Sequence, residues 1–140
     1  MSADPAFRQY WRLNWLGSLN EFADIGLQRR MWLDLTNRNP HWSYVEFMCK
    51  YFDDVICDRT YAQLVAEGLV SAAEATLVEP LHALLDEHEA PDGNDSNAAG
   101  VLADPAWLAI TEIAKATNLR LVALLADPSE RAALLSPIEV

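Results

Sequence analysis

The sequence lacks the features that mark membrane spans and secreted, disulfide-bonded domains. It contains no run of about 18 apolar residues, so we expect no transmembrane helix. Residues 1–16 lack the apolar stretch of a signal peptide. Only two cysteines occur, and in the helix predicted there Cys49 and Cys57 would lie about 12 Å apart along the axis, beyond the reach of a disulfide. We therefore expect a soluble, cytoplasmic protein with reduced thiols.

Basic residues are scarce, and the segment from Thr60 to Ala114 contains none, against ten acidic residues. The whole chain has 21 acidic and 10 basic residues, which gives a net charge of −11. Nucleic acids and anionic membrane surfaces are bound by clustered cations, so we exclude both as partners. The charge favours a basic protein partner. The alternative interpretation is that the acidity simply keeps the protein in solution.

Few segments alternate apolar and polar residues, which leaves little room for β-strands. Signals for helix starts are instead frequent. Asp-Pro pairs begin at three positions, and a Ser followed by Glu three residues later occurs at three more: Asp4, Asp104, Asp127, Ser18, Ser43 and Ser71. We predict an all-α fold, a single-domain bundle of six or seven helices spanning residues 1–140, with one long loop at residues 90–102.

Apolar spacing predicts which helix faces form the core. Phe7, Trp11 and Trp15 recur every four residues in the first helix. The helix that begins at Ser43 has a helical stripe that we assign to the core: Val45, Met48, Cys49, Phe52, Val55 and Ile56. Gly26 is expected to interrupt the helix predicted over residues 18–36, and Pro80 to kink or divide the one over residues 71–89.

Catalytic, metal-binding and DNA-reading patterns are incomplete. Glu79 and His82 have the spacing of a di-metal bundle ligand pair, but no second copy occurs. Residues 62–76 have the outline of a helix-turn-helix, yet its second helix begins at Ser71 without a base to read DNA. No nucleophile signature surrounds the three histidines. We expect no catalytic residues, no metal site and no cofactor.

The helix that begins at Ser43 has a second apolar face beside the core stripe. Aromatic residues lie on this face and carboxylates lie on or near it, a composition typical of a binding surface for a basic protein. The predicted partner-binding residues are Tyr44, Phe47, Tyr51, Asp53, Asp54 and Asp58. The alternative is that the aromatic residues pack inside the bundle and the acidic residues form a solvated face.

Two segments resemble a known group of proteins. They read WLGSLNEF at residues 15–22 and WSYVEFMCKYFDD at residues 42–54. In these stretches the first half of the chain is similar to small acidic bacterial immunity proteins, which pair with contact-dependent or other polymorphic toxins. The resemblance implies a cytosolic protein that blocks one toxin by surface complementarity, and it implies no particular residues.

Two classes of function follow from the sequence. The first is an acidic cytosolic protein-binding module, most concretely an immunity-type inhibitor of a cationic toxin. The alternative is an enzyme or small-ligand-binding bundle with a pocket among the aromatic N-terminal helices. The uneven charge also leaves open a homo-oligomer, in which the basic first part of one chain docks on the acidic middle of another.

Overall fold

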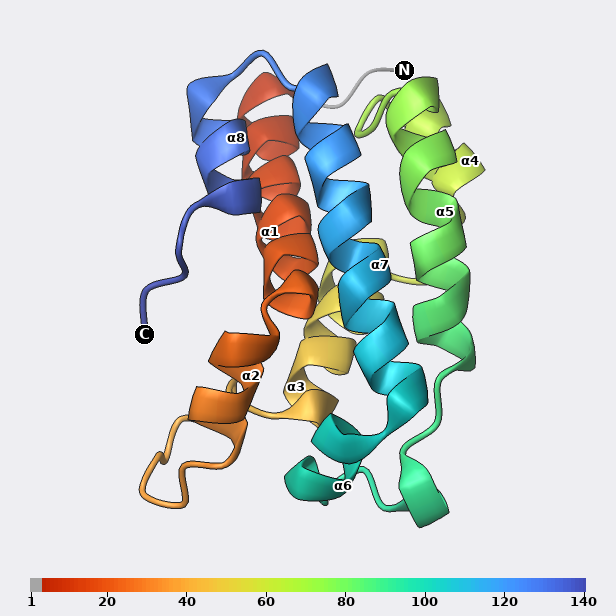
Figure 1. The fold of residues 1–140 in the computed structure, drawn as a ribbon. Helices are drawn as coiled ribbons and strands as arrows, with labels where there is room; N and C mark the ends of the chain where they lie inside the picture. The colour runs from red at the N-terminus through yellow and green to blue at the C-terminus, as the bar shows by residue number, and fades with distance from the viewer. Residues whose placement is uncertain (1–3) are drawn as a thin grey trace.

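The computed structural model describes residues 4–140, which form eight α-helices and no β-strand (Figure 1). The helices are α1 (Pro5–Ala23), α2 (Ile25–Trp32), α3 (Tyr44–Cys49), α4 (Tyr61–Ala66), α5 (Ala72–Glu87), α6 (Ala98–Ala103), α7 (Pro105–Leu121) and α8 (Pro128–Leu135). A π-helix (Lys50–Ile56) continues α3, and 3₁₀ turns occupy Pro91–Gly93 and Val122–Leu124. The predicted all-α bundle is confirmed. It has eight α-helices where six or seven were expected, and α6 lies almost wholly in the segment 90–102 that was predicted as a loop.

Helix α1 is the centre of the arrangement. It packs against α7 and α8 on one side and against α3 and the π-helix on the other. Figure 1 shows α1, α7 and α5 running side by side along the length of the molecule, with the short helices α2, α3 and α6 at one end. Among residues 4–140, no helix is both long enough and apolar enough to cross a membrane.

Most helices begin where the sequence places a cap. The carboxylates of Asp4, Asp104 and Asp127 accept hydrogen bonds from the first free amides of α1, α7 and α8, each just before a proline. Ser71 forms a full capping box at the start of α5, and Ser43 caps α3. These local signals therefore determine where the helices start.

Three local predictions need correction or refinement. Ser18 is not a cap, because it lies in the middle of α1. The break between α1 and α2 falls at Asp24, whose carboxylate caps α2 through the Leu27 amide, and Gly26 lies inside α2. Helix α5 is not divided at Pro80 but runs through it as one helix.

The buried Ser18 hydroxyl has no hydrogen-bond partner within residues 4–140, which makes it a target for stabilisation. We expect Ser18→Ala to raise the free energy of unfolding by about 1 kcal/mol, because an unpaired buried hydroxyl is removed and Ala favours the helix. Urea denaturation would measure this. Ser129→Ala, at an exposed position of α8, should change stability by less than about 0.5 kcal/mol. A loss of stability in Ser18→Ala would contradict the conclusion that the Ser18 hydroxyl is buried without a hydrogen-bond partner within residues 4–140.

The core is rich in aromatic residues from distant parts of the chain. Phe22 of α1 makes edge-to-face contacts with Phe47, Tyr51 and Trp107, at centroid distances of 5.6 to 6.4 Å. The Trp107 indole N–H donates to the Gln28 side-chain oxygen at 2.9 Å, so this buried polar group is satisfied. The centre of the bundle thus joins α1, α2, α3, the π-helix and α7.

A buried ion cluster, which we call the Arg12 clamp, ties α1 to α5 and α8. The guanidinium of Arg12 binds both oxygens of Glu74, at 2.9 and 2.6 Å, and both oxygens of Glu130, at 2.9 and 3.0 Å. It also donates to the Leu69 carbonyl at 2.9 Å. Burial opposes ionisation of Glu74, but hydrogen bonds from Arg12 and from the Ser71 amide outweigh it and hold the pKa of Glu74 below its ordinary value.

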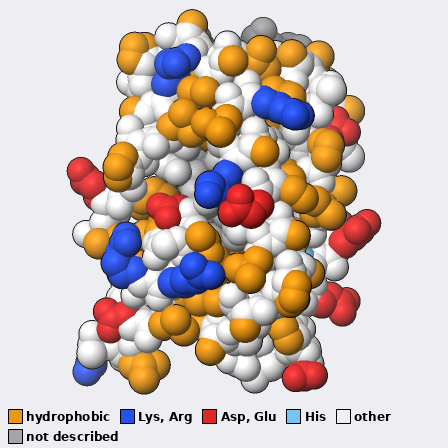
Figure 2. Space-filling view, viewed as in Figure 1, with side chains coloured by type: hydrophobic (Ala, Val, Ile, Leu, Met, Phe, Trp, Pro, Cys, Tyr) orange, Lys and Arg blue, Asp and Glu red, His pale blue; other side chains and the backbone are white. Residues whose placement is uncertain are grey.

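Surface charge is divided between the faces of the bundle. Five of the ten basic residues are exposed on α2, α7 and α8, namely Arg29, Arg30, Lys115, Arg120 and Arg131. Figure 2 shows Lys and Arg side chains spread over the face where α1, α7 and α8 lie, with most of the visible carboxylates toward its edges. Helices α4 and α5 carry no basic residue. The field of the −11 charge is therefore least compensated on the side of α4 and α5.

Candidate functional site

The three aromatic residues of the predicted binding surface lie in the core. Tyr44 is 6%, Phe47 1% and Tyr51 0% exposed. Tyr44 packs edge-to-face on Trp107, and Tyr51 packs on Phe22. The prediction that they are available to a partner is wrong, because a side chain this deeply buried reaches no partner while the bundle is folded.

The three carboxylates predicted for the same surface are exposed. Asp53 and Asp54 belong to the π-helix, and Asp58 follows it. Cys57 and Asp58 both adopt left-handed backbone conformations, with φ of 52° and 60°, which non-glycine residues adopt rarely. Their part in partner binding stays a prediction, whereas the aromatic contacts must come from elsewhere.

The helix offers two adjacent apolar faces, and the stripe predicted for the core lies beside the face that is buried. Tyr44, Phe47 and Tyr51 recur at the three- and four-residue intervals of an α-helix, and the π-helix begins only at Lys50. The inward face carries Tyr44, Phe47 and Tyr51 before it reaches Val55, while Val45, Met48 and Phe52 are only partly buried. The larger aromatic side chains thus take the deeper side, against the aromatic residues of α1, α2 and α7.

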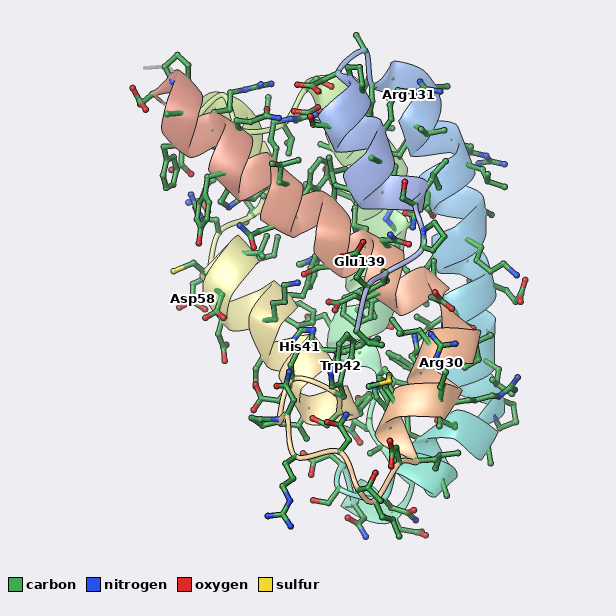
Figure 3. All side chains as sticks on the ribbon, turned by 90° about the vertical axis from the view of Figure 1, so that its left-hand side faces the viewer. Arg30, His41, Trp42, Asp58, Arg131 and Glu139 are labelled. Carbon is green, nitrogen blue, oxygen red and sulfur yellow. The ribbon has the colours of Figure 1, made fainter. Side chains whose placement is uncertain are left out.

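A groove of about 620 Å³ runs between the N-terminal half of α1 and the helical stretch of α3 and the π-helix. Figure 3 looks onto this side of the fold, with α1 above the π-helix and α3 and with Asp58 and His41 labelled. We call it the α1–π groove. It is lined by Phe7, Tyr10, Trp11, Asn14, His41, Glu46, Lys50, Asp54, Val55, Cys57 and Arg59.

The aromatic wall of the α1–π groove comes from α1. Phe7 is 50% and Tyr10 is 69% exposed, so both rings can be reached from solvent. Trp11 is buried except at the groove, and its indole N–H donates to the Val55 carbonyl at 2.9 Å. Its ring also stacks on Trp15 at a centroid distance of 5.6 Å. The prediction placed Phe7 in the core, and no sequence signal singled out Tyr10.

The cations of the α1–π groove are already paired, whereas two of its carboxylates are not. Lys50 lies 3.2 Å from the buried carboxylate of Glu21, which His41 also contacts at 2.5 Å. Arg59 binds Glu67 at 3.0 Å and two backbone carbonyls. Within residues 4–140, the carboxylates of Glu46 and Asp54 make no ion pair. An incoming ligand therefore meets uncompensated negative charge there.

Tyr44, His88 and Asp104 form a chain of hydrogen-bonded side chains inside the bundle. Tyr44 Oη lies 2.8 Å from His88 Nδ1, and His88 Nε2 lies 2.9 Å from Asp104 Oδ2. Burial, with the charges of Asp95, Asp104 and Glu89, raises the pKa of Tyr44 to about 12, so its phenol keeps its proton. Within residues 4–140, no group of three His, Cys, Asp or Glu side chains could hold a metal ion.

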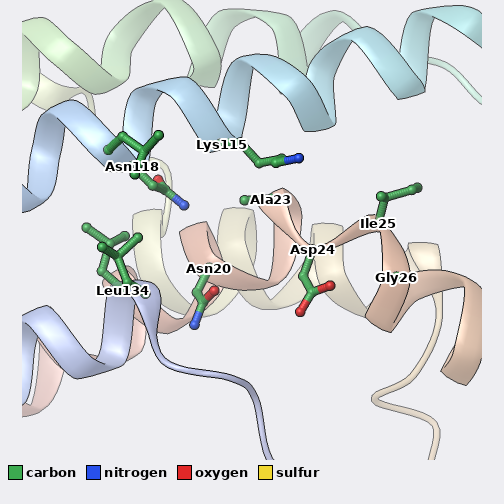
Figure 4. Close-up of a pocket in the computed structure, with 10 residues that line it drawn as sticks. Asn20, Ala23, Asp24, Ile25, Gly26, Lys115, Asn118 and Leu134 are labelled. Carbon is green, nitrogen blue, oxygen red and sulfur yellow. The ribbon is translucent and has the colours of Figure 1, made fainter.

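A second cavity, of about 450 Å³, opens where α1 meets α2, beside α7 and α8 (Figure 4). It is lined by apolar side chains and by the polar groups of Asn20, Asp24, Lys115 and Asn118. Asn118 donates to the Leu19 carbonyl at 2.9 Å, and its side-chain oxygen has no partner within residues 4–140. None of the sequence-predicted site residues lines this cavity.

The α1–π groove brings together one predicted site residue, Asp54, with two aromatic residues that the sequence assigned to the core, Phe7 and Trp11, and with Tyr10, which it did not single out. Asp53 and Asp58 lie beside it in the chain but do not line it. No family model, curated protein or solved structure matches this chain. Of the two cavities described above, the α1–π groove is the one that holds a predicted site residue, and we take it as the candidate site.

Proposed function

We propose that this protein is an acidic protein-binding module whose partner is a cationic protein. Most concretely, we propose an immunity-type inhibitor that neutralises a toxin domain by surface complementarity. The observation that carries the proposal is the α1–π groove. It offers the exposed rings of Phe7 and Tyr10 together with the carboxylates of Glu46 and Asp54, which make no ion pair within residues 4–140. Aromatic anchors in a cleft are typical centres of protein interfaces.

The charge of the whole molecule supports a cationic partner. The excess of acidic residues attracts a basic protein over long range and speeds its encounter with this one. A toxin that acts on nucleic acid needs clustered cations for the phosphates. Carboxylates held against those cations would compete with the phosphates, and a tightly bound acidic module would thereby block the toxin.

The direct test is recovery of the partner from the native host with the tagged full-length chain. We expect a basic protein in a one-to-one complex that loses its activity when bound. Recovery of an acidic protein, or of no protein at all, would contradict the proposal.

One observation keeps a second function in view. The α1–π groove has a volume of about 620 Å³, within the range of small-molecule sites, and it is lined by aromatic residues of the first helix. A ligand-binding bundle would use the same cleft. Mass spectrometry of the native, purified protein distinguishes the two, because a copurifying small molecule without a protein partner favours the second function.

Removing carboxylates around the groove should slow association with the partner. We expect Asp54→Asn with Asp58→Asn to reduce the association rate constant at low salt, and the difference should shrink as salt is raised, since exposed charges steer the encounter. The free energy of unfolding should change by less than about 0.5 kcal/mol. Stopped-flow or surface-plasmon kinetics at two salt concentrations measure the rates.

A matched double variant controls for net charge. Glu79→Gln with Glu87→Gln also removes two exposed carboxylates, but from α5. We expect it to slow association less than the groove-side pair does. Equal slowing by both pairs would mean that the partner responds to total charge and not to the groove.

A further inference from the structure

The wall of the α1–π groove that α1 forms can receive a flat cation. Trp11 is held in place by its hydrogen bond to the Val55 carbonyl and by stacking on Trp15. Tyr10 and Phe7 are exposed at the same wall. The faces of aromatic rings carry negative partial charge and attract cations within about 6 Å. This wall therefore supplies both apolar contact area and an electrostatic preference for positive charge.

The opposite wall supplies hydrogen-bond acceptors for the same cation. Glu46 of α3 and Asp54 of the π-helix are exposed and have no cation of their own in the described chain. The two cations of the groove pair with other carboxylates, Lys50 with Glu21 and Arg59 with Glu67. The aromatic rings of one wall and the two carboxylates of the other thus line the same groove.

We propose that the α1–π groove is a receptor for an arginine side chain of the partner, seated between the aromatic wall and the carboxylates of Asp54 and Glu46. Arginine fits better than lysine because its planar guanidinium stacks on a ring and binds a carboxylate through two parallel hydrogen bonds. The volume of about 620 Å³ leaves room for the residues that flank the arginine. This inference rests on the proposed function, since it names the partner group that the groove holds.

The test uses the full chain and a short blocked peptide, Gly-Gly-Arg-Gly-Gly, at low ionic strength. Two further peptides replace the arginine by lysine or by citrulline, which is nearly isosteric but uncharged. Titrations followed by nuclear magnetic resonance give the dissociation constants. We expect the arginine peptide to bind about tenfold more tightly than the citrulline peptide, and more tightly than the lysine peptide, because both contacts need the flat charged group. Equal binding of all three peptides would overturn the proposal.

Variants locate the bound arginine. Asp54→Asn and Tyr10→Ala should each weaken the arginine peptide about tenfold, whereas Tyr10→Phe should retain most of the affinity because the ring remains. Asp53→Asn is the matched control, since Asp53 is exposed on the same π-helix but does not line the groove. A loss from Asp53→Asn as large as that from Asp54→Asn would also overturn the proposal.

The outcomes separate this inference from the proposed function and identify the source of the cation. If the partner binds but the arginine peptide does not, the inference fails and the proposed function stands. If the arginine peptide binds but no basic partner protein exists, the proposed function fails and the cation site remains. A third arm uses free arginine amide. If free arginine amide binds as tightly as the arginine peptide and no protein partner is recovered, the site binds a free organic cation. That result would overturn the proposal that the groove holds an arginine of a partner protein.

Discussion

Arg12→Ala should lower the free energy of unfolding by about 3–5 kcal/mol, which is a large part of the stability of an ordinary domain. The reason is that two carboxylates depend on the one guanidinium of Arg12. Glu74 and Glu130 are both buried, and both take their charge compensation from the same guanidinium. Its removal leaves two buried carboxylates facing one another. Urea denaturation followed by circular dichroism measures the loss, if the variant still folds.

Two further variants show whether the clamp or the side-chain volume is responsible. Arg120→Ala, at an exposed position of α7, should cost less than about 0.5 kcal/mol. A triple variant, Arg12→Met with Glu74→Leu and Glu130→Met, replaces the whole cluster by apolar groups and should recover most of the loss. A triple variant no more stable than Arg12→Ala would show that uncompensated charge is not the cause.

The Arg12 clamp also determines how the free energy of unfolding changes with pH. The pKa of Glu74 is lower in the folded protein than its ordinary value of 4.5. A depressed carboxyl pKa contributes stability at pH values above the unfolded pKa, and this contribution is lost as the pH falls through the folded pKa. Destabilisation of the native chain on acidification should therefore begin below about 4.5, and the triple variant should lack this part of it.

Tyr51→Ala should be the other strongly destabilising substitution, at about 3–5 kcal/mol. Tyr51 is fully buried, and its hydroxyl bonds Tyr61 at 2.8 Å and His82 at 2.9 Å. Truncation leaves a cavity beside Phe22 and removes both hydrogen bonds. Tyr51→Phe keeps the ring and should cost only about 1–2 kcal/mol. Thermal unfolding of the three proteins measures the difference.

This substitution also decides between the two interpretations of the aromatic face. If Tyr51 is a core residue, Tyr51→Ala lowers the melting temperature strongly, and any effect on a complex follows from the loss of folded protein. If the melting temperature is unchanged and only the lifetime of the complex shortens, Tyr51 contacts the partner directly. The second result would contradict the buried position described above.

The helix starts could be predicted from the sequence because their causes are local. An Asp before Pro, or a Ser three residues before Glu, satisfies free amides at the first turn wherever the chain is otherwise helical. Ser18 shows the limit of this rule, since the same pattern falls inside α1, where the helix needs no cap. Helix α6 escaped prediction because Asn97 caps it without a capping box or a following proline.

The site could be predicted only in part, because its decisive features depend on tertiary contacts. The helix from Ser43 has two adjacent apolar faces, and only its packing against the aromatic residues of α1, α2 and α7 decides which of the two points inward. The charge of the groove depends on which groups are already paired. Lys50 is neutralised by Glu21, and Arg59 by Glu67. Asp54 was identified from its sequence, but its partners across the groove, Phe7 and Tyr10, come from a helix more than forty residues earlier.

The Arg12 clamp has a further consequence, for how long a folded molecule persists. It joins Arg12 to Glu74 and Glu130, which lie 62 and 118 positions further along the chain. Contacts between such distant residues require closure of long loops and so tend to form late in folding. Interactions that are absent from the folding transition state affect mainly the rate of unfolding. We therefore expect the clamp to slow unfolding, which lengthens the lifetime of the native state, and to have little effect on the folding rate.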